Sequence, residues 1–282
     1  MFMELNIQRL NQLKGFGLAA IVLSCGAAIG VLQQHRLESL QDVDTLTPET
    51  VARQANAEKT SLEIWQRTPA FGFDNLLADW AFLRFLQYFG DSDARAMNDY
   101  RMSADFFEVV VERDPWFVES YFYLSGSSSL FAGTPERTVE LLDRGLAEMT
   151  PLEPDGSQFL WRMKAIDEHL FLGDIDSAIK SYLKAAEWAG YHDDPKSRDA
   201  ASRSKDTAAF LLRDPRSVRA QVTAWVSLLS NARDNVTRQR AIGELEALGV
   251  ELTLNENGSV TYRIPEEVWE AERERLNITE TE

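Results

Sequence analysis

Histidine is the residue most often used for metal binding and for proton transfer near neutral pH, and this chain has three. His169 directly follows Asp167 and Glu168, but residues one and two positions apart on a helix do not converge on one point. A second histidine four residues away, as in zinc proteases, is missing. We therefore expect His169 to lie on a helix at the surface of a helical hairpin.

His192 precedes Asp193 and Asp194, a set that could hold a cation loosely. A solvated loop that caps the next helix explains these residues more simply. We therefore expect no metal site and no bound cofactor in this protein.

Patterns typical of nucleophilic or phosphate chemistry are also missing from the sequence. The serine-rich stretch 124–133 (LSGSSSLFAG) lacks the Gly-x-Ser-x-Gly pattern of a nucleophile elbow, and no Walker A or Gly-rich dinucleotide motif is present. Cys25 is the single cysteine, so neither an intramolecular disulfide nor a Cys-based metal centre can form. We expect a protein that is not an enzyme, with a site in 190–264 as the catalytic alternative.

The composition indicates an ordered, acidic protein. The 282 residues are 44% hydrophobic and 10% aromatic, and the formal net charge is −16. Nucleic acid is excluded as an expected partner, because neutralising phosphates requires clustered Lys and Arg. The charge suits a solvated face or a basic protein partner.

Residues 15–32 (GFGLAAIVLSCGAAIGVL) form an apolar run without a charge, which is near the minimum length for a transmembrane helix. Arg9 and Lys14 precede it and Arg36 follows it, which favours a cytoplasmic N-terminus. We expect residues 1–36 to be a single-pass membrane anchor, with the bulk of the chain in an extracytoplasmic space such as a periplasm or a thylakoid lumen.

Two other interpretations of this run place the body of the protein on the same side of the membrane. The residues before Cys25 resemble a bacterial lipobox, although the chain stays apolar for seven residues after it. The small residues around Cys25 also fit a cleavable signal sequence.

Beyond a connector at 37–47, Gly, Pro and Asp divide the chain into helical segments. One exception is 250–264, where alternating apolar residues flank an Asn257-Gly258 turn and predict a β-hairpin packed against the preceding helices. The fold class we expect is all-α with one small β-hairpin. The expected helices are 48–67, 74–90, 102–113, 117–132, 135–149, 157–172, 175–189, 197–212, 215–231, 235–248 and 265–277.

Residues 71–90 (FGFDNLLADWAFLRFLQYFG) are the most hydrophobic stretch of the body. Asp79 and Arg84 near the middle make the segment a poor membrane span, because each costs about 2.5 to 3.5 kcal/mol in a bilayer. We expect a water-soluble helix with Asp74 as its N-cap. Its apolar residues lie all around the helix, which predicts that it is covered on more than one side.

Three helical segments share a spacing of four and then three residues between small or apolar positions, which lets two helices pack closely. The best example is 161–189, where Gly173-Asp174 turns the chain between two helices. The positions are Ser103, Phe107 and Val110; Thr138, Leu142 and Gly145; and Ala178, Tyr182 and Ala185.

This pattern resembles the tetratricopeptide repeat (TPR), and with the preceding apolar run it is similar to membrane-anchored TPR-like proteins of bacteria, including cyanobacteria. The resemblance covers about residues 74–190, and a long loop at 91–102 departs from the family pattern. It implies an α-solenoid of TPR-like hairpins over 48–249, closed by the hairpin and a capping helix in 250–282; another α-solenoid is the alternative. Carried over from the family, the groove positions that would bind a protein or peptide are Glu119, Phe122, Met163 and Asp167.

The expected function is a membrane-anchored scaffold or assembly factor that binds protein partners. On the family resemblance alone, photosynthetic-complex assembly is one possible setting, and a component of an envelope export machine is the alternative. The acidic helix 265–277 is expected to be a polar cap, or else an acidic docking surface.

Overall fold

The computed structural model describes residues 23–31, 33, 47–254 and 260–275. The chain divides into two compact units, Met1–Val51 and Ala52–Glu282. In the first unit, residues 23–31 are helical and exposed, and Cys25 is a free thiol. Half of the predicted span at 15–32, residues 15–22 and 32, lies outside the described residues. Among those that are described, no helix has both the length and the apolar character needed to cross a bilayer.

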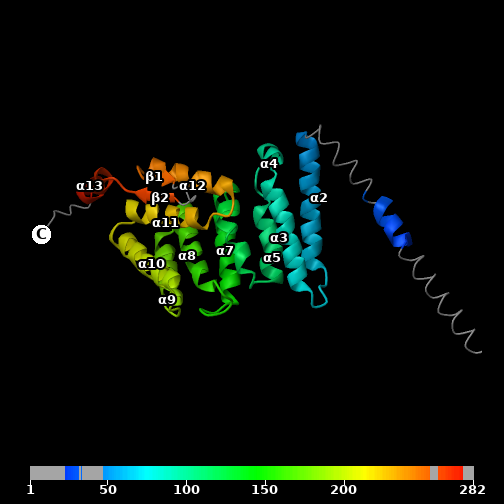
Figure 1. Ribbon diagram of the computed structural model, residues 1–282, viewed down its shortest axis with the longest axis horizontal. Coiled ribbons are helices and arrows are strands. Elements are labelled where there is room, and N and C mark those ends of the chain that lie inside the picture. The colour runs from blue at the N-terminus through cyan, green and yellow to red at the C-terminus, as the bar shows by residue number, and fades with distance from the viewer. Residues whose placement is uncertain (1–22, 32, 34–46, 255–259, 276–282) are drawn as a thin grey trace, which may run out of the picture. The chain divides into compact units, whose positions relative to one another are not determined.

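The body is mostly helical, with one two-stranded antiparallel sheet (Figure 1). Its α-helices are α2 (Pro48–Arg67), α3 (Asp74–Gly90), α4 (Ser92–Asn98), α5 (Ser103–Arg113), α6 (Val118–Tyr121), α7 (Pro135–Ala147), α8 (Leu160–Asp167), α9 (Ile175–Ala189), α10 (Pro195–Arg213), α11 (Val218–Asn231), α12 (Asn235–Ala247) and α13 (Glu266–Arg275). Two short π-helices, η2 (Ser125–Phe131) and η4 (Glu168–Leu172), and a 3₁₀ turn, η3 (Ser157–Phe159), complete the helical part.

Helices that follow one another along the chain pack side by side. α3 contacts α5, α5 contacts α7, and the sequence of neighbours continues from α7 through α8, α9, α10 and α11 to α12. One core cluster lies around α3, α5 and α7 and is rich in aromatic rings; Phe85 stands within 4.5 Å of Phe107 and 5.5 Å of Phe89, centroid to centroid. A second cluster, built on α8 to α12, centres on residues such as Tyr182 and Leu211.

Several helix boundaries follow from caps that the sequence contains. The Asp174 side chain accepts a hydrogen bond from the Ser177 amide at the start of α9, and Asp194 does the same for Ser197 at the start of α10. The loop at His192 is therefore a capping loop, as predicted. Gly173 ends η4 with a φ of 66°, which favours glycine.

The predicted hairpin is present as β1 (Glu251–Leu254) and β2 (Val260–Arg263), with Leu252 opposite Tyr262. β1 contacts α12, and Leu252 and Ile264 pack against the second core cluster, so the hairpin lies against the preceding helices as expected. The predicted Asn257-Gly258 turn lies outside the described residues.

Three predictions about local structure are wrong. The predicted loop at 91–102 contains α4, because Asp91 caps its start by accepting from the Ala94 amide at 3.0 Å and Arg95 donates to the Asp99 carbonyl at 2.7 Å. The predicted helix 117–132 is broken by a turn after α6 and continues as the π-helix η2, whereas 157–172 is helical throughout as η3, α8 and the π-helix η4. Asp74 is not a side-chain N-cap; it forms an ion pair with Arg113 at 2.9 Å.

The coverage of α3 also differs from the prediction. Ala78, Ala81 and Phe85 are fully buried, but Leu76 and Trp80 on the opposite face are more than half exposed. The hydrophobic pattern of a helix does not reveal whether both faces have a partner. The nine positions of the four–three pattern are all buried, as close helix packing requires.

Candidate functional site

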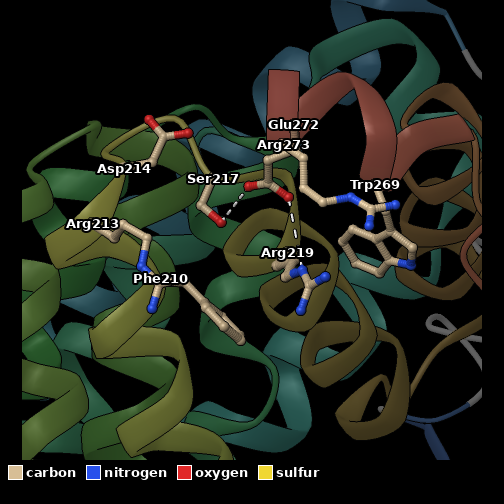
Figure 2. A pocket seen from close by; sticks show the side chains of 8 residues that line it. All are labelled: Phe210, Arg213, Asp214, Ser217, Arg219, Trp269, Glu272 and Arg273. Atoms are coloured by element: carbon tan, nitrogen blue, oxygen red, sulfur yellow. Dashed lines mark hydrogen bonds and ion pairs between the residues drawn. The ribbon is translucent and has the colours of Figure 1, made fainter. Parts of the chain in front are cut away.

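A cavity of about 220 Å³ lies where α10, α11 and α13 meet (Figure 2). Its lining combines three arginines, two aromatic rings, two carboxylates and one hydroxyl. The residues are Phe210, Arg213, Asp214, Ser217, Arg219, Trp269, Glu272 and Arg273. We call this cavity the arginine pocket.

The first wall is positioned by the turn between α10 and α11. The Asp214 amide donates to the Phe210 carbonyl at 2.9 Å and ends α10, and its carboxylate accepts from the Arg216 amide at 3.0 Å. Ser217 then begins α11, with its hydroxyl oxygen accepting from the Ala220 amide at 3.3 Å. This Asp-Pro-x-Ser turn therefore places the end of α10 and the start of α11 on the same side of the pocket.

The second wall comes from α13, which Glu272 attaches to the start of α11. Its buried carboxylate accepts from the Ser217 hydroxyl at 2.8 Å and from the Val218 amide at 3.0 Å. A carboxylate at a helix N-terminus is stabilised by the free amides and by the helix dipole. Glu272 thus caps α11 from another helix and fixes α13 beside it.

Arg219 is held between aromatic rings inside the pocket. Its guanidinium carbon lies 4.1 Å from the centre of the Trp269 ring and 5.8 Å from that of Phe210. Its Nε is 4.0 Å from a carboxylate oxygen of Glu272 (Figure 2). Stacking on Trp269 covers one plane of the guanidinium and is compatible with hydrogen bonds from its Nη groups in the plane of the group.

The other two arginines differ in how they are engaged. Arg273 forms an ion pair with Glu266 on its own helix. Arg213 is exposed and makes no ion pair with any residue of the described segments. The pocket therefore presents planar cationic donors beside apolar surface, an arrangement that binds carboxylate or phosphate oxygens on a partly apolar ligand.

The four residues predicted to line a binding groove do not share an exposed face. Glu119 is exposed and Phe122 is half-buried, whereas Met163 and Asp167 are buried at 6% and 0% exposure. Their role in partner binding stays a prediction. The arginine pocket was not predicted, although the unusual density of Arg213, Arg216 and Arg219 in an acidic chain is a signal that could have pointed to it.

Asp167 belongs instead to a buried polar cluster between η2, α8 and η4. The Ser125 hydroxyl donates to its carboxylate, and burial raises the pKa of Asp167 to about 7 despite that hydrogen bond. Next to it, Lys164 contacts Glu168 at 3.0 Å and Asp143 at 2.9 Å.

His169 continues this cluster and corrects another prediction. It is buried, with 6% exposure, and its ring lies 6.5 Å from that of Tyr182, so it is not at a hairpin surface. Burial lowers the pKa of His169 to about 4, which keeps the imidazole neutral. The π-helical turn of η4 brings it inward, and sequence spacing does not reveal such a turn.

Within the described segments, no group of three or more His, Cys, Asp or Glu side chains is arranged to hold a metal ion. Comparison with protein-family models, with curated proteins and with solved structures gives no match.

Proposed function

We propose that this protein is a non-catalytic scaffold that binds acidic segments of partner polypeptides in the arginine pocket. The proposal includes the predicted N-terminal anchor and an extracytoplasmic body with TPR-like helical hairpins. The observation that carries it is the stacked Arg219 in the same pocket as Arg213, which makes no ion pair within the described residues; this arrangement is suited to a carboxylate on a partly apolar ligand.

The size of the pocket supports a polypeptide segment over a large cofactor. At about 220 Å³ it is smaller than the roughly 300–1,000 Å³ typical of small-molecule sites. Such a volume accommodates one or two side chains of an extended segment. Trp269 and Phe210 contact the apolar part of such a segment, and the guanidinium groups bind its carboxylate.

The charges that line the pocket indicate the charge of the bound segment more directly than the net charge of the chain does. A net charge of −16 suits a basic partner, but three arginines against two carboxylates in the lining give the pocket a small local excess of positive charge, and Arg213 and Arg219 are the guanidinium groups that we expect to bind the partner. Bidentate hydrogen bonds from Arg to carboxylate give this site orientation as well as affinity.

The test is crosslinking and pulldown of the full-length protein from its own membranes, followed by binding of synthetic segments of the recovered partner. We expect Arg213→Gln combined with Arg219→Gln to abolish recovery. Arg198→Gln is the matched control, because Arg198 is exposed on the same helix as Arg213 but does not line the pocket.

The direct measurement is titration of the purified protein with acidic segments and with the same segments carrying Gln and Asn for Glu and Asp. Binding that survives this replacement, or recovery that is equal for the double variant and the control, would contradict the proposal.

A further inference from the structure

α3 carries an exposed apolar stripe on the face opposite to its buried one. Leu76, Trp80 and Leu83 are exposed at 61%, 53% and 53%, and Phe73, just before the helix, at 64%. These positions follow one another at intervals of three, four and three residues. That spacing is the a/d pattern of a coiled-coil seam.

The width of the stripe indicates what covers it. At about 100° per residue, Leu76, Trp80 and Leu83 span about 60° of the helix, narrower than the roughly 100° face that a helix buries in a core and typical of a coiled-coil seam. The charged residues on α3 are Asp74, Asp79 and Arg84, which lack the basic excess of helices that lie on membranes. Both features favour a second helix over a bilayer.

We propose that this stripe pairs with the same stripe of a second copy of the chain, with the two α3 helices parallel. With Leu76 and Leu83 at d positions and Trp80 at an a position, Asp79 falls at g and Arg84 at e. In a parallel pair, g of one helix faces the following e of the other. Asp79 of each copy then faces Arg84 of the other, so the surface is self-complementary.

The Arg84 guanidinium has enough N–H donors to bind Asp79 of a second copy in addition to its partners within the chain. Its Nε and one Nη bind Glu58, and its other Nη donates to Gln87 at 3.2 Å. Three of the five N–H groups of a guanidinium are used in this way, and the other two make no hydrogen bond to the described residues. The contact with Glu58 also holds the side chain in place beside the stripe.

An antiparallel pair lacks this complementarity. When the a and d layers are matched in the antiparallel direction, the two Asp79 side chains lie close together, and like charges at such positions disfavour pairing. The orientation is therefore a specific part of the proposal and can be tested by itself.

The test is disulfide crosslinking of the full-length protein in membranes, in a Cys25→Ser background. In a parallel seam equivalent residues meet, so Leu76→Cys and Leu83→Cys should each form disulfide-linked dimers at least ten times faster than Glu112→Cys, an exposed control on α5. Association through the N-terminal run alone would give equal crosslinking rates at positions 76, 83 and 112. Equal rates would overturn the proposal.

Mixing Leu76→Cys with Trp80→Cys tests the orientation, because matched antiparallel layers place a d position opposite an a position. Crosslinks between positions 76 and 80, without crosslinks of either position to itself, would show an antiparallel pair and overturn the proposal. We expect Asp79→Arg to slow crosslinking of Leu76→Cys about tenfold, while Asp93→Arg, an exposed charge reversal on α4, leaves it unchanged. Equal rates for the two reversals would also contradict the pairing of Asp79 with Arg84.

Discussion

Asp167 and His169 should give the stability of this protein opposite dependences on pH. Burial raises the pKa of Asp167 from 3.8 to about 7, so the folded state holds its proton more tightly than the unfolded chain does. Its contribution to stability is fully present below pH 3.8 and is lost as the pH rises through about 7. At about 1.4 kcal/mol per pH unit, this loss amounts to about 4 kcal/mol.

His169 acts in the other direction. Burial lowers its pKa from 6.5 to about 4, so the folded state binds a proton less readily than the unfolded chain. Its contribution is present above pH 6.5 and is lost as the pH falls through about 4, which amounts to about 3 kcal/mol. In the wild-type protein the two effects largely cancel between pH 4 and 6.5.

Single substitutions should separate the two effects. We expect the free energy of unfolding of Asp167→Asn to increase by about 3 kcal/mol from pH 4 to 6.5, and that of His169→Gln to decrease by about 4 kcal/mol from pH 4 to 7. The measurement is urea unfolding followed by far-UV circular dichroism at half-unit pH steps. The double variant is the control, since it removes both effects. A profile of Asp167→Asn that follows the wild type across this range would refute the reasoning.

Three further substitutions test the packing. Gly145→Ala places a Cβ 1.9 Å from the buried Tyr121 hydroxyl. We expect it to reduce the free energy of unfolding by about 1 to 3 kcal/mol, which a calorimetric scan would detect as a lower melting temperature. Arg113→Met should lower the free energy of unfolding by about 3 kcal/mol in urea, because Arg113 donates to three carbonyls at the end of α2; an unchanged midpoint would contradict this. Arg162→Met should leave the free energy of unfolding unchanged or raise it by up to about 4 kcal/mol in the same assay, because Arg162 is buried and contacts no carboxylate of the described residues. Ser204 and Ser227, to which Arg162 donates, keep their own hydrogen bonds to backbone carbonyls after the substitution.

Local signals predicted most of the helices well. The bounds of α2, α3 and α9 agree with the sequence prediction because Pro48, the Gly173-Asp174 turn and similar residues determine where a helix can begin or end. The hairpin was predicted from another local signal, its alternating apolar residues. Such signals act within a few residues, and a sequence displays them directly.

Features that depend on distant contacts were not predicted. The arginine pocket joins residues 210–219 to residues 269–273, and Glu272 reaches a helix start 54 positions away. The inward position of His169 depends on the π-helical turn of η4, and the polar residues of η2 meet Asp167 from 42 positions away. Periodicity identified α3 as apolar all round, but it did not show which face is left exposed by the part of the chain that the structure describes.

The Glu272 cap makes the arginine pocket dependent on a local folding equilibrium. If α13 detaches, the pocket loses Trp269 and Arg273, and at the same moment the Val218 amide at the start of α11 loses its acceptor. A ligand that binds only the assembled pocket therefore stabilises the docked form of α13, by about 2.7 kcal/mol at a free concentration a hundred times its dissociation constant. Val218 does not line the pocket, but its amide donates to Glu272. Slower hydrogen exchange at this amide would therefore report that the pocket is occupied.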